Sequence, residues 1–107
     1  MRARVHTLEL ETPEEYEAGL QIVADDLLPW ARESTGFCGA LGLVDPERGK
    51  ALLITLWVDD ETRTESADAA ERFSALAAAA SGANRRPIEN FNVAFFDVVR
   101  EPRARAD

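Results

Sequence analysis

The sequence predicts an α+β domain of the ferredoxin-like type, with the order β-α-β-β-α-β, a four-stranded antiparallel sheet and two helices on one face of that sheet. Three observations support this prediction. Residues 36–57 have the pattern of a β-hairpin, a helical pattern stands on each side of that hairpin, and a strand pattern stands near each end of the chain. Right-handed crossovers then place the first and third strands at the centre of the sheet.

The first strand is expected over residues 2–10, where polar and apolar residues alternate loosely. Val5 lies on one face of this strand, and the opposite face carries His6, Leu8 and Leu10. The sequence leaves open which of the two faces meets the helices.

The first helix begins at the sequence TPEE, in which Thr12 is the expected N-cap, Pro13 the first helical residue and Glu15 the capping-box partner. Pro29 has no amide hydrogen, so we expect a kink there or a short second segment over residues 30–34. Between these points an apolar stripe follows helical spacing through Tyr16, Leu20, Val23 and Leu27.

The hairpin consists of two apolar runs separated by the turn sequence DPERG. Asp45 can accept hydrogen bonds from the amides just ahead, Pro46 suits the first corner of a type I turn, and Gly49 suits a left-handed position. The second run, residues 51–57, is almost wholly apolar, so both of its faces need cover. One layer of helices covers one face, and a second copy of the same sheet is the most economical cover for the other.

The acidic residues 59–62 suit the positive end of a second helix, whose body is expected to reach about Ala80. Gly82 lies in the segment that ends it. The predicted buried stripe of this helix consists of Ala70, Phe73, Ala77 and Ala80.

The last strand is expected over residues 88–99, and both of its faces are again largely apolar. Residues 1–100 are therefore expected to form a single domain, and the polar residues 101–107 a flexible C-terminal tail.

Composition narrows the classes of partner. The formal net charge of -8 repels nucleic acid and anionic lipid, so neither nucleic acid nor a membrane is an expected partner. Cys38 is the single cysteine, which suggests a reducing compartment, and no stretch approaches bilayer length. We therefore expect a cytoplasmic protein.

Five short pieces of the chain resemble the antibiotic biosynthesis monooxygenase-like (ABM) family, in particular its small stand-alone actinobacterial members. The resemblance covers essentially residues 2–99. The matching pieces are Leu28-Pro29, Gly36-Phe37-x-Gly39, Leu43-Val44-Asp45, Gly49 and Thr55-Leu56-Trp57.

This resemblance implies a homodimer in which two sheets pack through their faces into a dimeric α+β barrel, with a pocket between sheet and helices in each subunit. Some members oxidise aromatic polyketide-like substrates with molecular oxygen and need no metal or flavin, others degrade haem, and others have no known activity. The haem-degrading branch uses a Trp and a His on the second helix. Residues 61–80 contain neither residue type, which disfavours haem degradation.

His6, the single histidine, is the candidate catalytic residue. As a hydrogen-bonding or proton-shuttling group it would suit a phenolic substrate whose deprotonation prepares it for oxygen. The alternative is a partly buried strand histidine satisfied by a backbone carbonyl. One histidine cannot form a metal site, so no metal is expected.

The candidate ligand-binding residues are Trp30, Trp57, Asn90, Asn92 and Tyr16, and each also has a structural interpretation. Trp57 would stack on a flat ligand or fill the core under the second helix. Trp30 would line a pocket mouth or rest on the partner subunit. Asn90 and Asn92 would bind a ligand's oxygens or the partner's backbone, and Tyr16 would belong to the core.

Two functions therefore stand side by side. The first is a cofactor-independent monooxygenase that acts on a flat aromatic or quinol substrate. The alternative is a non-catalytic homodimer that binds a small ligand or has a structural role. A cavity of at least roughly 300 Å³ lined by His6, Trp57 and an asparagine would favour the first.

Overall fold

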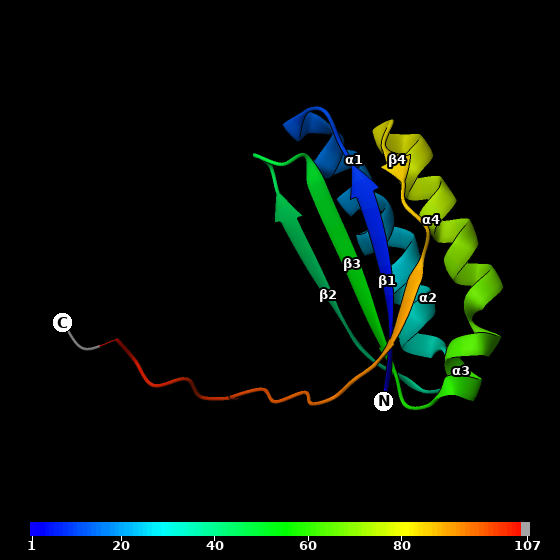
Figure 1. The fold of residues 1–107 in the computed structure, drawn as a ribbon, viewed down its shortest axis with the longest axis vertical. Coiled ribbons are helices and arrows are strands. Elements are labelled where there is room, and N and C mark those ends of the chain that lie inside the picture. The colour runs from blue at the N-terminus through cyan, green and yellow to red at the C-terminus, as the bar shows by residue number, and fades with distance from the viewer. Residues whose placement is uncertain (106–107) are drawn as a thin grey trace.

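The structure is a computed structural model that describes residues 1–105 of the chain. It confirms the ferredoxin-like α+β prediction, because an antiparallel sheet is covered on one face by helices (Figure 1). The elements in chain order are β1 (Arg2–Glu9), α1 (Pro13–Ile22), the π-helix η1 (Val23–Leu27), α2 (Leu28–Glu33), β2 (Phe37–Asp45), β3 (Lys50–Trp57), α3 (Asp60–Glu65), α4 (Ala67–Ser81), β4 (Asn84–Arg85) and β5 (Glu89–Asn92).

The sheet has the strand order β2-β3-β1, and the other edge of β1 pairs with both β4 and β5. β1 and β3 are antiparallel over their full lengths, from Arg2 opposite Trp57 to Glu9 opposite Lys50. The first and third strands are therefore central, as predicted. The sheet has five strands rather than four because β4 forms at residues 84–85, ahead of the predicted last strand, of which only β5 is present.

The register of β1 and β3 determines which side chains face the helices. His6 lies opposite Leu53, and both residues line a cavity beneath the helices. Because side chains alternate along a strand, Arg4 faces the helices as well, whereas Val5 and Ile54 face the opposite side. The face with His6 is thus the inner face of the chain.

The predicted hairpin is present, with β2 and β3 joined by residues 46–49. The Asp45 carboxylate accepts a hydrogen bond from the Arg48 backbone N–H at 3.3 Å. Gly49 has a φ of 62°, the left-handed conformation expected of it. These two turn predictions are confirmed. The Gly49 backbone N–H donates to the Pro46 carbonyl at 3.3 Å, so Pro46 is the first residue of that turn rather than its first corner.

The start of α1 differs from the expected capping box. The Glu15 carboxylate accepts a hydrogen bond from the Glu11 backbone N–H at 2.8 Å, one residue earlier than the motif requires. Within the described residues the Thr12 side chain makes no capping hydrogen bond, although Thr12 occupies the N-cap position. The helix still begins at Pro13, as predicted.

Pro29 produces a wide helical turn rather than a break. The Leu28 backbone N–H donates to the Val23 carbonyl, five residues earlier, which defines η1. Since proline lacks an N–H, the Asp25 carbonyl loses its usual partner four residues later, and the wider turn ahead of Pro29 accommodates that loss. The expected second segment is α2.

The second predicted helix is divided at Ser66 into α3 and α4. Asp59 caps α3, because its carboxylate accepts a hydrogen bond from the Thr62 backbone N–H at 2.9 Å. The acidic start of this helix therefore acts as predicted.

The buried stripe of α4 agrees with the prediction only in part. Ala70 and Ala77 are 3% and 5% exposed, but Ala80 is exposed, so its predicted burial was wrong. The buried residues follow a spacing of four, three and four, which reaches Ser81 rather than Ala80. The Ser81 hydroxyl is satisfied by donating to the Ala77 carbonyl at 2.8 Å.

The last strand is much shorter than the predicted residues 88–99. β5 ends at Asn92, and the Val93 backbone N–H then donates to the Met1 carbonyl at 3.0 Å. After this hydrogen bond the chain leaves the sheet as an extended C-terminal arm, residues 94–105 (Figure 1). Within the described chain no strand lies beside the arm, so its strand-forming residues have no ladder to join.

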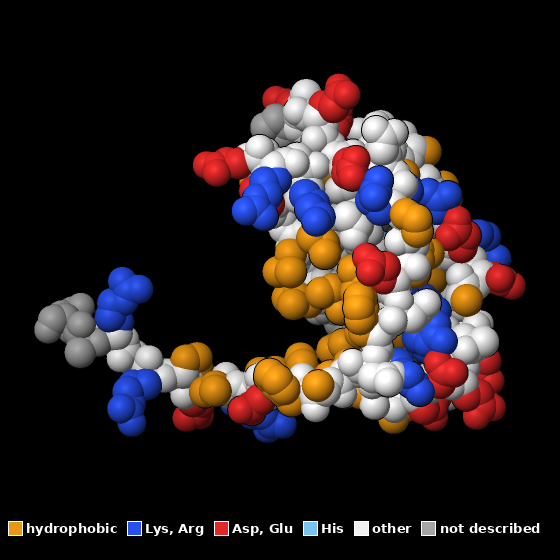
Figure 2. Space-filling model, viewed as in Figure 1, with side chains coloured by type: hydrophobic (Ala, Val, Ile, Leu, Met, Phe, Trp, Pro, Cys, Tyr) orange, Lys and Arg blue, Asp and Glu red, His pale blue; other side chains and the backbone are white. Residues whose placement is uncertain are grey.

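The sheet face turned away from the helices is bare in the single chain. Leu41 on β2 and Phe91 on β5 lie on this face and are 52% and 50% exposed. Figure 2 shows hydrophobic side chains gathered in the hollow between the sheet and the arm. The expectation that one helix layer leaves an apolar face uncovered is therefore confirmed for the chain itself.

Two sequence-based expectations concern the chain as a whole. In residues 1–105, no helix has both the length and the apolar character needed to span a bilayer. The boundary between a domain of residues 1–100 and a tail of residues 101–107 remains a prediction, and residues 106–107 lie outside the described residues.

The contact between Gly36 and α3 can be tested by substitution. Gly36 has a φ of 81°, and a Cβ atom there would lie 2.5 Å from the Thr62 hydroxyl oxygen. We expect Gly36→Ala to lower the free energy of unfolding by about 2 kcal/mol or more, measured by urea denaturation. Gly42→Ala is the matched control, since its Cβ would meet nothing within 4 Å. Equal losses in the two variants would contradict this account.

Candidate functional site

A cavity of about 380 Å³ lies between the sheet and the helices. β1, β2 and β3 form one wall, and α1, η1 and α4 form the other. The walls are mainly apolar side chains, which is typical of sites that hold small organic molecules. The polar residues among them are His6, Glu15, Tyr16 and Ser74.

His6 is a buried polar residue of this cavity, with 5% of its surface exposed. Within residues 1–105 neither ring nitrogen has a hydrogen-bond partner. The structural interpretation of His6, in which a backbone carbonyl satisfies the ring, is therefore wrong. A neutral imidazole has one N–H donor and one acceptor nitrogen, so a molecule in the cavity can satisfy both.

The surroundings of His6 keep its ring neutral. Burial, followed by the positive charge of Arg4, lowers the pKa of His6 from 6.5 to about 4. Glu71 on α4 raises this pKa in part, and Arg85 lowers it. At pH 7 the imidazole is therefore uncharged and its acceptor nitrogen is free of a proton.

Arg4 places a buried positive charge two residues from His6, on the same face of β1. Its guanidinium donates to the Ser66 hydroxyl at 3.0 Å and to the Arg63 carbonyl, and it lies 5.7 Å from the centre of the Trp57 ring. Burial, followed by the charge of Arg63, lowers the pKa of Arg4 to about 10, so Arg4 stays charged at pH 7. None of the ion pairs found in residues 1–105 includes Arg4.

Tyr16, a candidate ligand-binding residue, also lines the cavity. Its hydroxyl donates to the Asp45 carbonyl at 3.1 Å, which ties α1 to the end of β2. Because that O–H is already engaged, Tyr16 presents its ring to the cavity more than its hydroxyl. His6 and Tyr16 are the two predicted site residues that the fold brings to the same cavity.

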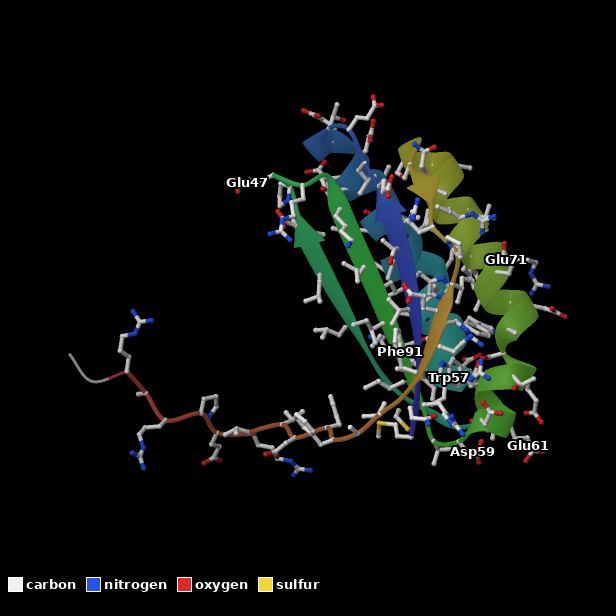
Figure 3. All side chains as sticks on the ribbon, in the orientation of Figure 1. Glu47, Trp57, Asp59, Glu61, Glu71 and Phe91 are labelled. Atoms are coloured by element: carbon white, nitrogen blue, oxygen red, sulfur yellow. The ribbon has the colours of Figure 1, made fainter. Side chains whose placement is uncertain are left out.

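The two tryptophans belong to an aromatic cluster at the end of β3 rather than to the cavity lining. Trp57, labelled in Figure 3, is fully buried at 0% exposure, and its indole N–H donates to the Thr55 hydroxyl at 3.0 Å. Trp30 packs between Trp57 and Phe73, with ring centres 6.2 and 5.3 Å away. Trp57 thus takes the core position. Trp30 does not line the cavity, and its contact with a partner subunit stays a prediction.

Asn90 and Asn92 are both exposed on β5, opposite Arg4 and Arg2. They lie outside the cavity lining. The cavity that would favour the monooxygenase is therefore present only in part: its volume exceeds roughly 300 Å³ and His6 lines it, but neither Trp57 nor an asparagine does.

Two residues of this region, Arg4 and Ser74, were not predicted from the sequence. Alternation along the first strand already places Arg4 on the face of His6, so a signal for Arg4 was present. Ser74 falls four residues after Ala70 and three before Ala77, which also places it on the buried stripe. Among the described residues no three His, Cys, Asp or Glu side chains gather into a potential metal site.

Comparison with known proteins identifies relatives in fold. No protein-family model matches the sequence, and no curated protein matches it. Solved structures match the fold over nearly the whole chain. The monooxygenase of the ActVA-Orf6 gene of Streptomyces coelicolor, in complex with the ligand nanaomycin D, is 14% identical, has a TM-score of 0.67, and covers 92% of this chain and 91% of its own.

Two further structures are similar in the same way. SnoaB, a cofactor-independent oxygenase from Streptomyces nogalater, is 13% identical with a TM-score of 0.62, and the match covers 94% of this chain and 97% of SnoaB. A dimeric ferredoxin-like protein from an uncultured marine organism is 13% identical with a TM-score of 0.62, and the match covers 92% of each chain. The resemblance to antibiotic biosynthesis monooxygenase-like proteins is therefore confirmed at the level of the fold.

The lowered pKa of His6 predicts a specific pH dependence of stability. In the folded state His6 binds its proton only near pH 4, whereas in the unfolded state it binds near pH 6.5. Between these values the unfolded state holds more protons, so stability falls as the pH falls, by about 2 kcal/mol at pH 5. Urea denaturation at pH 7 and pH 5 measures this loss.

The variant His6→Leu is the control for this experiment, because it keeps a side chain of similar size without a titratable group. We expect this variant to lack the His6 contribution between pH 7 and pH 5. Parallel losses in the wild type and the variant would contradict the lowered pKa.

Proposed function

We propose that this chain binds a flat aromatic molecule with a phenol or quinol hydroxyl in its cavity, and that it acts as a monooxygenase that needs no cofactor. The observation that carries the proposal is the pair of unpartnered nitrogens of His6, buried in an apolar cavity of about 380 Å³. A buried polar atom without a hydrogen bond costs about 1–3 kcal/mol, so a ligand that supplies the bond is stabilised there.

The charge pattern favours a ligand with an acidic hydroxyl. The neutral His6 ring can accept a hydrogen bond from that hydroxyl. The nearby positive charge of Arg4 favours the deprotonated form of the ligand, because opposite charge lowers the pKa of an acid. Full proton transfer to His6 is opposed by burial and by the same charge, so we assign His6 the role of orienting the hydroxyl.

Oxidation by molecular oxygen fits such a ligand. A deprotonated phenol or enol is rich in electrons and reduces oxygen more readily than its neutral form. In an anthrone-type substrate, the ring CH₂ group becomes a C=O group. One atom of O₂ enters the product and the other leaves as water with the two hydrogens. The similar fold of SnoaB, a cofactor-independent oxygenase, supports this reaction class.

A non-catalytic ligand-binding protein is the second candidate. The observation that favours it is the low pKa of His6, which makes this ring a weak base. Apart from His6, the polar groups of the cavity walls are few, and the Tyr16 hydroxyl is already bound to Asp45.

The assembly that we propose is a homodimer through the bare sheet face. A contiguous apolar surface of this kind is typical of a protein interface. Support comes from the fold likeness to a dimeric ferredoxin-like protein. The exposed free thiol of Cys38 fits a reducing compartment, so we extend the proposal to a cytoplasmic location.

Ligand binding and turnover are tested together. We expect anthrone-type and quinol probes to raise the melting temperature of the wild type. We expect His6→Leu to bind such probes about tenfold more weakly, as the loss of one buried hydrogen bond implies. An oxygen electrode then measures whether bound probes are oxidised.

Asn90→Ala is the control for these measurements, because Asn90 is exposed and lies outside the cavity. Oxygen uptake that slows in His6→Leu and not in Asn90→Ala supports the monooxygenase. Binding without uptake would instead select the non-catalytic candidate, and no binding of any probe would contradict both.

The dimer interface is tested with two leucines of equal exposure. Leu41 on the bare face and Leu76 on α4 are 52% and 51% exposed. We expect Leu41→Glu to convert the dimer to a monomer in light-scattering measurements at micromolar concentration, because it buries a charge between two sheets. Leu76→Glu should leave the dimer unchanged. A dimer that survives Leu41→Glu would show that the sheet face is not the interface.

A further inference from the structure

β2 contributes small residues to the cavity wall. Its inner face carries Ala40 and Gly42, both of which line the cavity, whereas Leu41 between them lies on the bare face. Ala40 and Gly42 are also exposed. The cavity therefore extends over a strip of β2 where almost no side chain rises above the backbone.

The structure around Gly42 does not require a glycine. Within residues 1–105 a positive φ occurs at four glycines, and Gly42 is not one of them. A Cβ atom at Gly42 would meet nothing within 4 Å, its chain neighbours aside, so a side chain is not excluded. Glycine weakens the interior of a strand, and it often marks a place where a ligand or another backbone approaches closely. The free space above Gly42 is therefore what this glycine provides.

Gly42 lies in one cross-strand row with His6. Gly42 is opposite Leu53 on β3, and Leu53 is opposite His6 on β1. Two strand spacings, about 10 Å, separate His6 from Gly42. Both residues line the same cavity. A flat molecule that bonds to His6 and lies along this row passes over Leu53 and ends above Gly42.

The row runs from the closed side of the cavity to its open side. His6 is 5% exposed, whereas Val44, the next inner-face residue of β2 after Gly42, is 51% exposed. Leu20 on α1 also lines the cavity and is 50% exposed. A ligand that enters between Leu20 and Val44 therefore passes close to Gly42 on its way to His6.

We propose that Gly42 is a specificity-determining residue of the cavity. The hydroxyl of the ligand bonds to His6, and the ring at the far end of the ligand packs on the Gly42 backbone, in the space that a larger residue would fill. A ligand with a single ring reaches His6 without reaching Gly42, so Gly42 discriminates between ligands by their length. This inference rests on the proposed function and deepens it.

NMR titration of the full-length protein tests this role of Gly42. His6 is the single histidine of the chain, so its imidazole C–H resonances report binding at His6 without ambiguity. The probes are phenol, which has one ring, and an anthrone-type molecule, which has three fused rings. We expect both probes to shift the His6 resonances of the wild type.

The variant Gly42→Leu fills the space at the far end of the row. We expect it to bind the anthrone-type probe at least tenfold more weakly than the wild type, and to bind phenol within twofold of the wild type.

The variant Gly42→Ala adds one methyl group and should have an intermediate affinity for the anthrone-type probe. Its melting temperature should equal or exceed that of the wild type, because alanine removes the entropic cost of a glycine in a strand. If Gly42→Leu does not fold, Gly42→Ala decides the test alone.

Ala80→Leu is the control for added bulk, because Ala80 is exposed on α4 and lies outside the cavity lining. Its affinities for both probes should equal those of the wild type. Light scattering on each variant measures whether the assembly has changed.

The outcomes separate this inference from the proposed function. Selective loss of the anthrone-type probe in the Gly42 variants supports the inference. An unchanged affinity for that probe, or an equal loss for both probes, would overturn the role of Gly42 and leave binding at His6 standing. So would a Gly42→Leu dimer that dissociates with unchanged probe affinities, because a partner side chain would then occupy the space. Probes that leave the His6 resonances of the wild type unshifted would contradict the proposed function and this inference with it.

Discussion

The antiparallel ladder between β1 and β3 is the constraint on which the rest of the structure depends. Its register places Arg4 opposite Thr55 and His6 opposite Leu53, so the charge and the imidazole share the inner face. The same alternation turns Val5 and Ile54 to the opposite side, which no helix of residues 1–105 covers. A slip of one residue would exchange these faces and move His6 out of the cavity. The cavity and the bare face are thus two consequences of one register.

The cavity walls contain few polar groups, and this scarcity determines the chemistry of the site. Among the described residues the donor and the acceptor of His6 have no partners, and Arg4 donates to neutral oxygens of Ser66 and Arg63 rather than to a carboxylate. Ser66 also ends α3 and begins α4, so the division of the second helix is where the guanidinium is held. The fold therefore couples a helix break to the electrostatics of the site.

Much of the fold could be predicted because local signals and tertiary structure agree. A few neighbouring residues encode the turn at Gly49, the cap at Asp59 and the apolar residues on both faces of β3. The last strand could not be predicted, because strand propensity does not reveal whether a neighbour exists at Phe95. The site was predicted less well. Trp57 and Asn90 are residue types that often bind ligands, but contacts with residues distant in the sequence place Trp57 in the core and Asn90 outside the cavity.

The pairing of the two tryptophans has a spectroscopic consequence. Both indoles lie within one cluster, with Trp30 half-buried and Trp57 fully buried, so tryptophan fluorescence reports on that end of the core alone. Phe73 packs against Trp30 and also lines the cavity. A ligand in the cavity could therefore change the emission of Trp30 through Phe73. Changes at the far end of the sheet, near the turn at residues 46–49, would leave the tryptophan emission unaltered, and there Tyr16, whose hydroxyl donates to the Asp45 carbonyl, is the nearer intrinsic fluorophore.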